Sequence, residues 1–257
     1  MNYDKELLFA KDLAEKAGTI MAANLSLSTE AVWKADNTPL TATDTEINRL
    51  VIESVQKAFP SHGILGEEES FETKREKLWV VDPIDGTQPF TLGVPLSTFC
   101  LSLVIEGQPV LGIINDPYMK RMFWAAKDQG AFVNNEGIHV SKAETLAQNF
   151  VILSSRMHNK ERTTGEIFDL IEEQKAKSLN FRSFAYGSML VACGRAVGTI
   201  IGVPNAWDAS ATKIIIEEAG GKVTDVDGND RRYDGDGNGL LATNGLVHEQ
   251  MLKLIHP

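Results

Sequence analysis

Two aspartates end an apolar run in the first third of the chain. Residues 78–81 have the pattern of a short buried strand, and Asp82-Pro83-Ile84-Asp85-Gly86-Thr87 follows directly. Carboxylates at the end of a buried strand are costly unless a positive charge binds them. Mg²⁺ suits such a place because it takes oxygen ligands. Asp-Pro and Asp-Gly are also common turn dipeptides, so the spacing alone leaves a structural role equally open.

A turn suited to anions follows the aspartates. Gly86 and Thr87 are expected to turn the chain sharply. If a helix or turn begins there, the backbone N–H groups of Gly86, Thr87 and Gln88 lack helical partners and favour an anion. A metal-binding acid pair beside an anion-binding turn indicates a site for phosphate esters.

Three further carboxylates are candidates for the same site. Glu67 follows the apolar pair 64–65, Asp208 follows Trp207, and Asp44 falls in the first turn of a predicted helix. The simpler interpretation of Asp208 is an N-cap. For Asp44 it is a carboxylate that interacts with the positive end of the helix dipole. As ligands, Asp208 and Glu67 could help to hold two or three Mg²⁺ ions. One ion would lower the pKa of a water and another would stabilise the leaving oxygen.

Three other known site motifs are not matched by this sequence. Residues 234–239 match D-x-D-x-N-G, but the twelfth position of a calcium loop would be Gly245 instead of an acid. The spacing D-x-x-D-G-T is one residue too long for phosphatases that use an aspartyl nucleophile. The five histidines show no metal-ligand spacing.

Composition narrows the class of protein. The chain has 257 residues, is 43% hydrophobic and carries a net charge of −10. This charge argues against binding to nucleic acid or to an anionic membrane. It still allows a small anionic substrate, because bound Mg²⁺ would reverse the local potential. The two cysteines lie in apolar surroundings and are expected to be free thiols. No segment resembles a signal peptide or a membrane span, so a cytoplasmic location is expected.

Hydrophobic periodicity predicts two halves, residues 1–145 and 146–257, in one compact unit. The first half should contain a helix over 4–24, a second helix opened by a Thr43-x-x-Glu46 capping box, and antiparallel strands over 97–133. The second half should alternate strands and helices, which indicates an α/β layer. Its expected elements are strands at 150–154, 180–182 and 198–203, and helices at about 160–175, around 189–192, and from Trp207-Asp208 to Gly220.

Three motifs together resemble the inositol monophosphatase superfamily. They are Gly66-Glu67-Glu68, the run from Trp79 to Thr87, and Trp207-Asp208-Ala209 with the later Glu217-Glu218-Ala219-Gly220-Gly221. The match covers nearly the whole chain in order. It implies a five-layered α-β-α-β-α sandwich and a Mg²⁺-dependent phosphomonoesterase that acts on small inositol or sugar phosphates. It also implies inhibition by lithium and, as in many members, a homodimer.

The resemblance implies metal ligands. Glu67, Asp82 and the backbone carbonyl of Ile84 would bind a first Mg²⁺, and Asp82, Asp85 and Asp208 a second. Glu67 would share a weaker third ion.

The resemblance also implies how substrate and water are held. Gly86, Thr87 and Gln88 would bind the phosphate, and Thr87, linked to Asp44, would orient the attacking water. Lys34 belongs to a segment, extending to residue 41, that matches a mobile segment closing over the site.

One departure from the family pattern leaves the substrate open. Inositol-specific members carry a glutamate seven residues before the Trp-Asp aspartate, and this chain has Ile201 there. An apolar side chain cannot accept hydrogen bonds from substrate hydroxyls. A histidinol-phosphate phosphatase of the same fold is therefore the first alternative, and a 3′-phosphonucleotide phosphatase is less favoured. A non-catalytic interaction module is the alternative of a different class.

Overall fold

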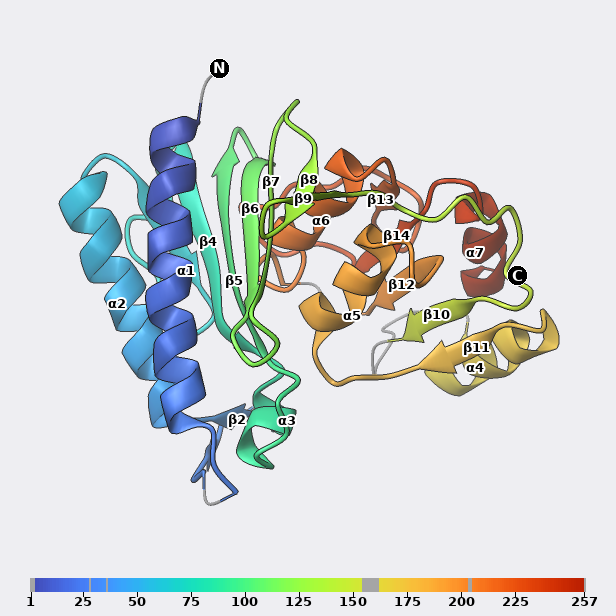
Figure 1. Cartoon of the computed structure of the whole chain (residues 1–257), viewed down its shortest axis with the longest axis horizontal. Coiled ribbons are helices and arrows are strands. Elements are labelled where there is room, and N and C mark those ends of the chain that lie inside the picture. Colours follow the sequence, from blue (N-terminus) through green and yellow to red (C-terminus); the bar gives the residue numbers. More distant parts are fainter. Residues whose placement is uncertain (1–2, 28, 36, 154–161, 203–204, 257) are drawn as a thin grey trace.

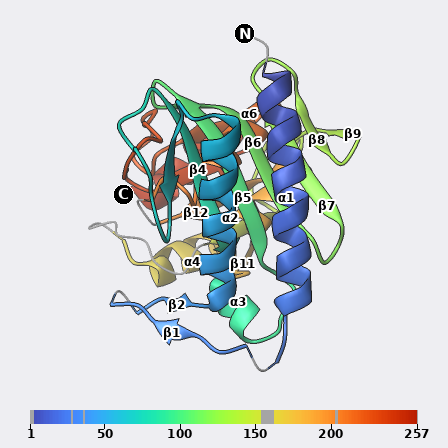
Figure 2. The same cartoon turned by 90° about the vertical axis from the view of Figure 1, so that its left-hand side faces the viewer.

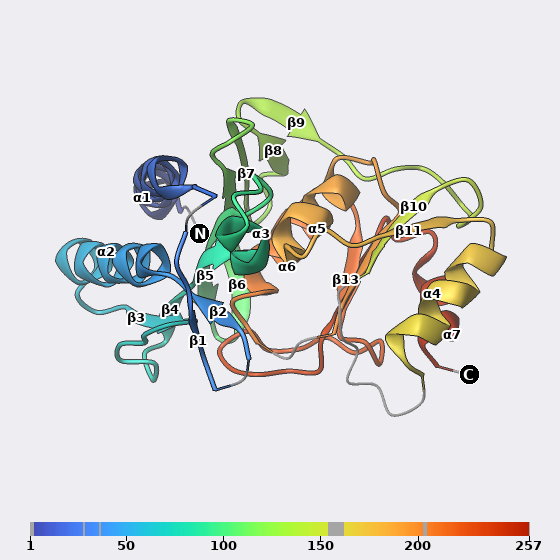
Figure 3. The ribbon, with the colours of Figure 1, turned by 90° about the horizontal axis from the view of Figure 1, so that it is seen from below.

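The structure is a computed structural model that describes residues 3–27, 29–35, 37–153, 162–202 and 205–256. Its helices and sheets form five layers (Figure 1). A helix pair covers a seven-stranded sheet, a second pair separates that sheet from a five-stranded one, and a third pair covers the far side. The view from below shows the same order of layers (Figure 3). The predicted α-β-α-β-α sandwich is confirmed.

The first layer consists of α1 (Asp4–Asn24) and α2 (Ala42–Ala58), which lie side by side over the first sheet (Figure 2). Each helix buries one apolar stripe at helical spacing, with Leu13 and Met21 in α1 and Val51 in α2. The bounds of α1 confirm the helix predicted over 4–24.

The start of α2 differs from the sequence-based prediction. Thr41 is the N-cap: its hydroxyl accepts the N–H of Asp44 at 3.4 Å, and the Asp44 carboxylate accepts the N–H of Thr41 at 2.8 Å. This reciprocal pair is the capping box. The predicted box of Thr43 and Glu46 is wrong because the helix begins earlier, directly after the strand β2 (Pro39–Leu40).

The first sheet carries the aspartate motif on its second strand. Its strands lie in sequence order, parallel between the first two and antiparallel elsewhere. They are β3 (Gly63–Gly66), β4 (Lys77–Asp85), β5 (Thr98–Ile105), β6 (Gln108–Asp116), β7 (Arg121–Ala126), β8 (Ala131–Val133) and β9 (Glu136–Ile138). The antiparallel run predicted over 97–133 is confirmed, and β9 extends it. A separate hairpin pairs β1 (Val32–Trp33) with β2.

The central layer consists of α5 (Phe184–Ala192) and α6 (Ser210–Glu218). Contact with the first sheet is close, because a Cβ added to Gly112 would lie 2.5 Å from the Ile214 side chain. Glycine therefore lets α6 approach β6. The predicted helix around 189–192 is confirmed, whereas α6 begins later than predicted, at Ser210 instead of near Trp207.

The second sheet has the order β11-β10-β12-β14-β13, with parallel pairing of β10 to both β11 and β12. Its strands are β10 (Phe150–Leu153), β11 (Lys177–Leu179), β12 (Gly198–Ile201), β13 (Lys222–Thr224) and β14 (Leu240–Thr243), and the outer helices are α4 (Thr164–Glu173) and α7 (His248–Ile255).

Two strands and one helix of this half were predicted at about their observed positions, namely β10, β12 and α4. Residues 154, 160, 161 and 203 of those predictions lie outside the described part of the chain. The strand predicted at 180–182 is wrong. Strand β11 ends at Leu179, before the predicted range. Arg182 has a φ of 58°, which is not the extended conformation of a strand.

A buried histidine in α7 should make folding pH-dependent. The ring nitrogens of His248 lie 3.0 Å from the Thr224 hydroxyl and 2.9 Å from that of Thr243. Burial lowers its pKa to about 4. An unfolded histidine titrates near 6.5, so the unfolded chain takes up the proton first as the pH falls, and stability drops between pH 6.5 and 4. We expect the wild type to lose about 2–3 kcal/mol relative to His248→Gln over this interval. Urea unfolding at a series of pH values measures this, and parallel curves would contradict it.

Two further observations concern the chain as a whole. Cys100 and Cys193 are free thiols, and burial raises the pKa of both. Among the described residues, no helix is long and apolar enough to cross a membrane.

Candidate active site

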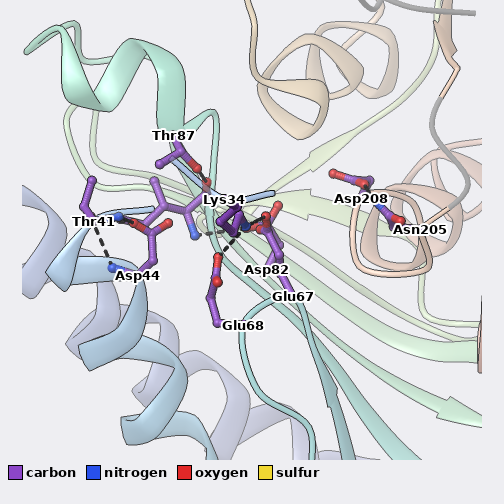
Figure 4. A network of polar contacts seen from close by, with 10 residues as sticks. Lys34, Thr41, Asp44, Glu67, Glu68, Asp82, Thr87, Asn205 and Asp208 are labelled. Carbon is purple, nitrogen blue, oxygen red and sulfur yellow. Dashed lines mark hydrogen bonds and ion pairs between the residues drawn. The ribbon is translucent and has the colours of Figure 1, made fainter. Parts of the chain in front are cut away.

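Asp208 meets two aspartates of a distant strand, Asp82 and Asp85, at the end of β4. One carboxylate oxygen each from Asp82, Asp85 and Asp208 lies within 4.8 Å of the other two. Residues three apart on a regular strand point to opposite faces. The pairing of β4 with β5 shifts register between Asp82 and Asp85, and this bulge allows both to face Asp208. Asp208 comes from the segment before α6 and lies beside Asn205 (Figure 4).

The aspartates of this cluster are buried beside other acids. Asp82 is only 2% exposed, and burial raises its pKa well above the ordinary value. The nearby carboxylates of Glu67, Asp85 and Asp208 raise it further. The pKa of Asp208 is also raised, first by burial and then by Glu67 and Asp85. Such a group of acids is stabilised by a cation, and its oxygen donors suit a hard divalent metal.

Asp85 joins the first sheet to the central layer. Its carboxylate accepts hydrogen bonds from the Ser183 hydroxyl, from the N–H groups of Phe184 at 2.8 Å and Ala185 at 3.0 Å, and from the Thr98 hydroxyl at 3.2 Å. Burial raises the pKa of Asp85, and these hydrogen bonds oppose the rise. Asp85 therefore lies across the first turn of α5, where the helix favours a negative charge.

We expect Ser183→Ala to weaken the binding of Mg²⁺ about 10- to 100-fold, because an oriented carboxylate binds metal better than a free one. Loss of this N-cap should also cost about 1 kcal/mol of stability. Isothermal titration with Mg²⁺ measures the affinity. Ser188→Ala is the matched control, since that hydroxyl donates to Phe184 O within the same helix. Equal Mg²⁺ affinity in the two variants would contradict the prediction.

Asp208 is not a helix cap. Ala209 occupies the N-cap of α6, and no side chain caps that helix. The N-cap interpretation of Asp208 is therefore wrong. One oxygen of Asp208 accepts a hydrogen bond from the Asn205 amide at 2.9 Å, which orients the carboxylate. The charge of Arg231 partly offsets the rise in the pKa of Asp208.

Glu67 lies next to Asp82 because of strand pairing. In the parallel β3–β4 ladder Gly66 pairs with Val81, and the N–H of Glu67 donates to Val81 O at 3.2 Å. The Lys34 ammonium lies 2.8 Å from Glu67 and 3.0 Å from Glu68 (Figure 4). Burial alone would lower the pKa of Lys34, but the two glutamates outweigh it and raise the pKa. Lys34 thus binds the acidic group from the side of β1.

Asp44 is fully buried at the start of α2. One of its oxygens accepts hydrogen bonds from the hydroxyl and the N–H of Thr41. The other, Oδ1, has no hydrogen-bond partner among the described residues. Burial raises the pKa of Asp44 to about 6. A buried acceptor without a partner is a place where a water or ligand can bind.

Within the described residues, Thr87 and Asp44 form no hydrogen bond with each other. The Thr87 hydroxyl donates instead to Ile84 O at 3.0 Å. The tight turn returns this hydroxyl to its own backbone, and the link between Thr87 and Asp44 that the resemblance implied stays a prediction.

The chain turns sharply after Asp85 and a helix begins there, as the sequence predicted. Gly86 has a φ of 88°, in the left-handed region, and the short helix α3 (Thr87–Thr91) follows. A Cβ on Gly86 would lie 2.8 Å from Ser183 Cβ. The first N–H groups of a helix have no acceptor within it, so those of Thr87 and Gln88 are available to a ligand.

Neither Ile201 nor the calcium-like segment belongs to the group of acids that could hold a metal, within the part of the chain that the structure describes. Ile201 ends β12 and is 1% exposed within the core between the sheets. Residues 234–239 form an irregular loop between β13 and β14, with no flanking helix in the described chain. The interpretation of that segment as a glycine-rich turn is confirmed.

Sequence reasoning missed Ser183, Asn205 and Thr98, which orient the aspartates. Only Ser183 had a local signal, as a serine before a helical stretch. Its contact with Asp85 spans 98 positions, so no local pattern could reveal it.

Comparisons with known proteins agree with this geometry. The model of the inositol monophosphatase family matches residues 2–257. A histidinol-phosphatase of Chlorobaculum parvum is 31% identical, over 97% of this chain and 96% of its own. A fructose-1,6-bisphosphatase/inositol-1-monophosphatase of Thermotoga maritima is 31% identical, over 84% of this chain and 82% of its own.

Solved structures support the same assignment. An IMPase of Thermotoga maritima superposes with a TM-score of 0.90 at 29% identity, covering 98% of this chain and 96% of its own. An inositol monophosphatase of Anabaena superposes with a TM-score of 0.86 at 28% identity, covering 99% and 96%. The chain belongs to the inositol monophosphatase family and is a phosphoric monoester hydrolase.

Proposed function

We propose that this enzyme is a Mg²⁺-dependent phosphomonoesterase that acts on small phosphate monoesters such as inositol or sugar phosphates. The observation that carries the proposal is the meeting of Asp82, Asp85 and Asp208 beside the turn at Gly86. A cation site next to free backbone N–H groups suits a phosphate group, whose oxygens need both kinds of partner.

The residues present fit a divalent metal. The pKa values of the Asp82, Asp85 and Asp208 carboxylates are raised, as expected where a cation is needed. Glu67, Asp82, the carbonyl of Ile84, Asp85 and Asp208 would hold two to three Mg²⁺ ions. When bound, these ions supply an activated water and neutralise charge on the departing oxygen.

The protein's own groups position the substrate and the water. Gly86, Thr87 and Gln88 present N–H groups to the phosphate, which stabilises the negative charge that develops on its oxygens. Asp44 offers a buried acceptor for a water proton through its unpartnered Oδ1. Lys34 forms ion pairs with Glu67 and Glu68 and so helps to position Glu67.

Phosphate release tests this proposal. We expect release from myo-inositol 1-phosphate or histidinol phosphate with Mg²⁺, and none with a chelator. Lithium should inhibit by competing for a magnesium position. Release that persists with the chelator, or no release from any monoester with Mg²⁺, would contradict the proposal.

Histidinol phosphate is the second candidate substrate. Two relatives named histidinol-phosphatase, from Chlorobaculum parvum and Mycobacterium tuberculosis, are 31% and 32% identical to this chain. Ile201 also speaks against strict inositol specificity. The ratio of kcat/KM for the two substrates, measured side by side, decides between them.

We also propose a homodimer. The side chains of Leu27, Trp33 and Leu92 are 88%, 64% and 67% exposed, and exposed apolar patches mark interfaces between proteins. Helix α3 and Leu27 lie together, since a Cβ on Gly93 would be 3.0 Å from Leu27 Cδ2. Light scattering during size exclusion should give twice the chain mass, and Trp33→Glu should shift it toward the monomer. A wild-type monomer at micromolar concentration would contradict the proposal.

A further inference from the structure

Residues 64–71 form a closed loop that carries Glu67 and is called the Glu67 loop below. Its two end residues pair as an antiparallel bridge, with N–H to carbonyl oxygen distances of 2.7 and 2.9 Å. Inside the bridge, the Ser70 hydroxyl accepts the N–H of Gly66 at 3.1 Å. The backbone on both sides of Glu67 is therefore tied together.

The side chain of Asn48 reaches this loop from α2. It is 1% exposed, and its amide nitrogen donates to Glu69 O at 3.1 Å. A Cβ on Gly66 would lie 2.6 Å from Asn48 Oδ1 and 2.3 Å from Glu69 O. Glycine at position 66 thus lets the amide approach the backbone closely. Asn48 contacts the loop on both sides of Glu67, at residue 66 and at residue 69.

Packing alone does not account for an asparagine at this place. Its Oδ1 is buried and has no hydrogen-bond partner among the described residues. A buried amide that is only partly hydrogen-bonded costs free energy that an apolar side chain would not. Residues that break a packing rule in this way are expected at functional sites, so the contact made by the Asn48 amide nitrogen needs a functional explanation.

The Glu67 loop lies between α2 and β4. On the β4 side, the N–H of Glu67 donates to Val81 O at 3.2 Å. On the α2 side, Asp44 lies one turn before Asn48, and its pKa is raised by burial and then by the charges of Glu67 and Glu68. This part of α2 therefore lies close to the two glutamates (Figure 4). Asn48 fixes the loop from the side opposite to its contact with β4.

We propose that Asn48 is a positioning residue that holds the Glu67 loop where the Glu67 carboxylate can bind the divalent metal. This inference rests on the proposed function, in which Glu67 is a metal ligand. Asn48 acts through the backbone of Gly66 and Glu69. Residues that orient a metal ligand raise the affinity for the metal, because the ligand then loses less freedom on binding.

Asn48→Ala should weaken the binding of Mg²⁺ about 10-fold, measured by isothermal titration of the purified protein. The Mg²⁺ concentration that gives half-maximal phosphate release should rise by a similar factor. At saturating Mg²⁺ the value of kcat should return close to that of the wild type, because every proposed ligand is still present. This separation of metal affinity from kcat distinguishes a positioning residue from a catalytic one.

A double-mutant cycle tests whether Asn48 acts through Glu67. In the Glu67→Gln background, Asn48→Ala should lower the Mg²⁺ affinity no further, because the carboxylate that it positions is already gone. If Asn48→Ala lowers the affinity by the same factor in both backgrounds, its effect does not pass through Glu67 and the proposal is overturned.

Two further variants separate positioning from stability. Val55→Ala removes a fully buried side chain two turns further along α2, and it should lower the thermal midpoint but leave the Mg²⁺ affinity unchanged. Asn48→Ser lacks an atom at the place of the amide nitrogen, while its hydroxyl can bond to the helix backbone. It should lose as much Mg²⁺ affinity as Asn48→Ala, and it serves if the alanine variant does not fold.

The outcomes for this inference and for the proposed function differ. Wild-type Mg²⁺ affinity in the folded Asn48 variants, or an equal loss in Val55→Ala, overturns the role of Asn48. A wild-type protein that neither binds Mg²⁺ nor releases phosphate with it overturns the proposed function instead.

Discussion

Asp82→Asn should lower kcat/KM by at least about 10³-fold while making the metal-free protein more stable. The amide cannot replace a negative metal ligand, so activity is lost. Its oxygen can still accept the N–H of Ile84, as Asp82 Oδ1 does at 3.0 Å, so the local backbone is kept. Without metal, the substitution removes one charge from a buried group that also contains Glu67, Asp85 and Asp208.

The pH dependence of the metal-free protein follows from the same charges. The pKa of Asp82 is raised in the folded state, so the folded protein holds its proton at pH values where the unfolded chain has released it. Wild-type stability without Mg²⁺ should therefore fall as the pH rises above about 4, and this fall should be smaller in Asp82→Asn. Denaturant unfolding with a chelator, from pH 4 to 8, measures the difference.

Added Mg²⁺ should reverse the order of stability. At a hundredfold excess over Kd, a ligand that binds only the folded state adds about 2.7 kcal/mol to the wild type, and Asp82→Asn should gain much less. Asp12→Asn is the control, because Asp12 forms an exposed ion pair with Lys16 on the outer face of α1. An Asp82→Asn enzyme with wild-type activity would exclude Asp82 as a metal ligand.

Gly86→Ala is expected to reduce both activity and stability. At a φ of 88° alanine is strained, and its Cβ would lie 2.8 Å from Ser183 Cβ and 3.3 Å from Pro89 Cγ. Strain and overpacking together should cost about 2–4 kcal/mol of unfolding free energy. A shift of the turn would also displace the N–H groups proposed to bind phosphate, lowering kcat/KM about 10²-fold or more.

The two effects of Gly86→Ala can be separated. Urea unfolding gives the change in stability, and kinetics at a temperature where the variant is fully folded give the change in activity. Gly235→Ala is the matched control, since a Cβ there meets nothing within 4 Å and should change stability by less than about 0.5 kcal/mol. A stable, fully active Gly86→Ala enzyme would show that this turn does not bind phosphate.

Local patterns predicted much of the first half of the chain. The helix of 4–24 follows from apolar residues at helical spacing, and the antiparallel strands of 97–133 follow from apolar runs separated by turn signals. The predicted start of the second helix was wrong because two nearby threonines could each be its N-cap. Thr41 and Thr43 both suit an N-cap, and the preceding strand β2 decides in favour of Thr41.

The sequence by itself determined the family, through the order and content of three motifs, and with it the types of residue at the site. Only the tertiary structure decided how those residues meet. The bulge in β4 turns Asp82 and Asp85 to one side, and the central helices bring Asp208 and Ser183 to them from more than 90 positions away. A sequence motif identifies functional residues that lie within a few positions of one another. Contacts across a core depend on packing between layers, which no short stretch of sequence contains.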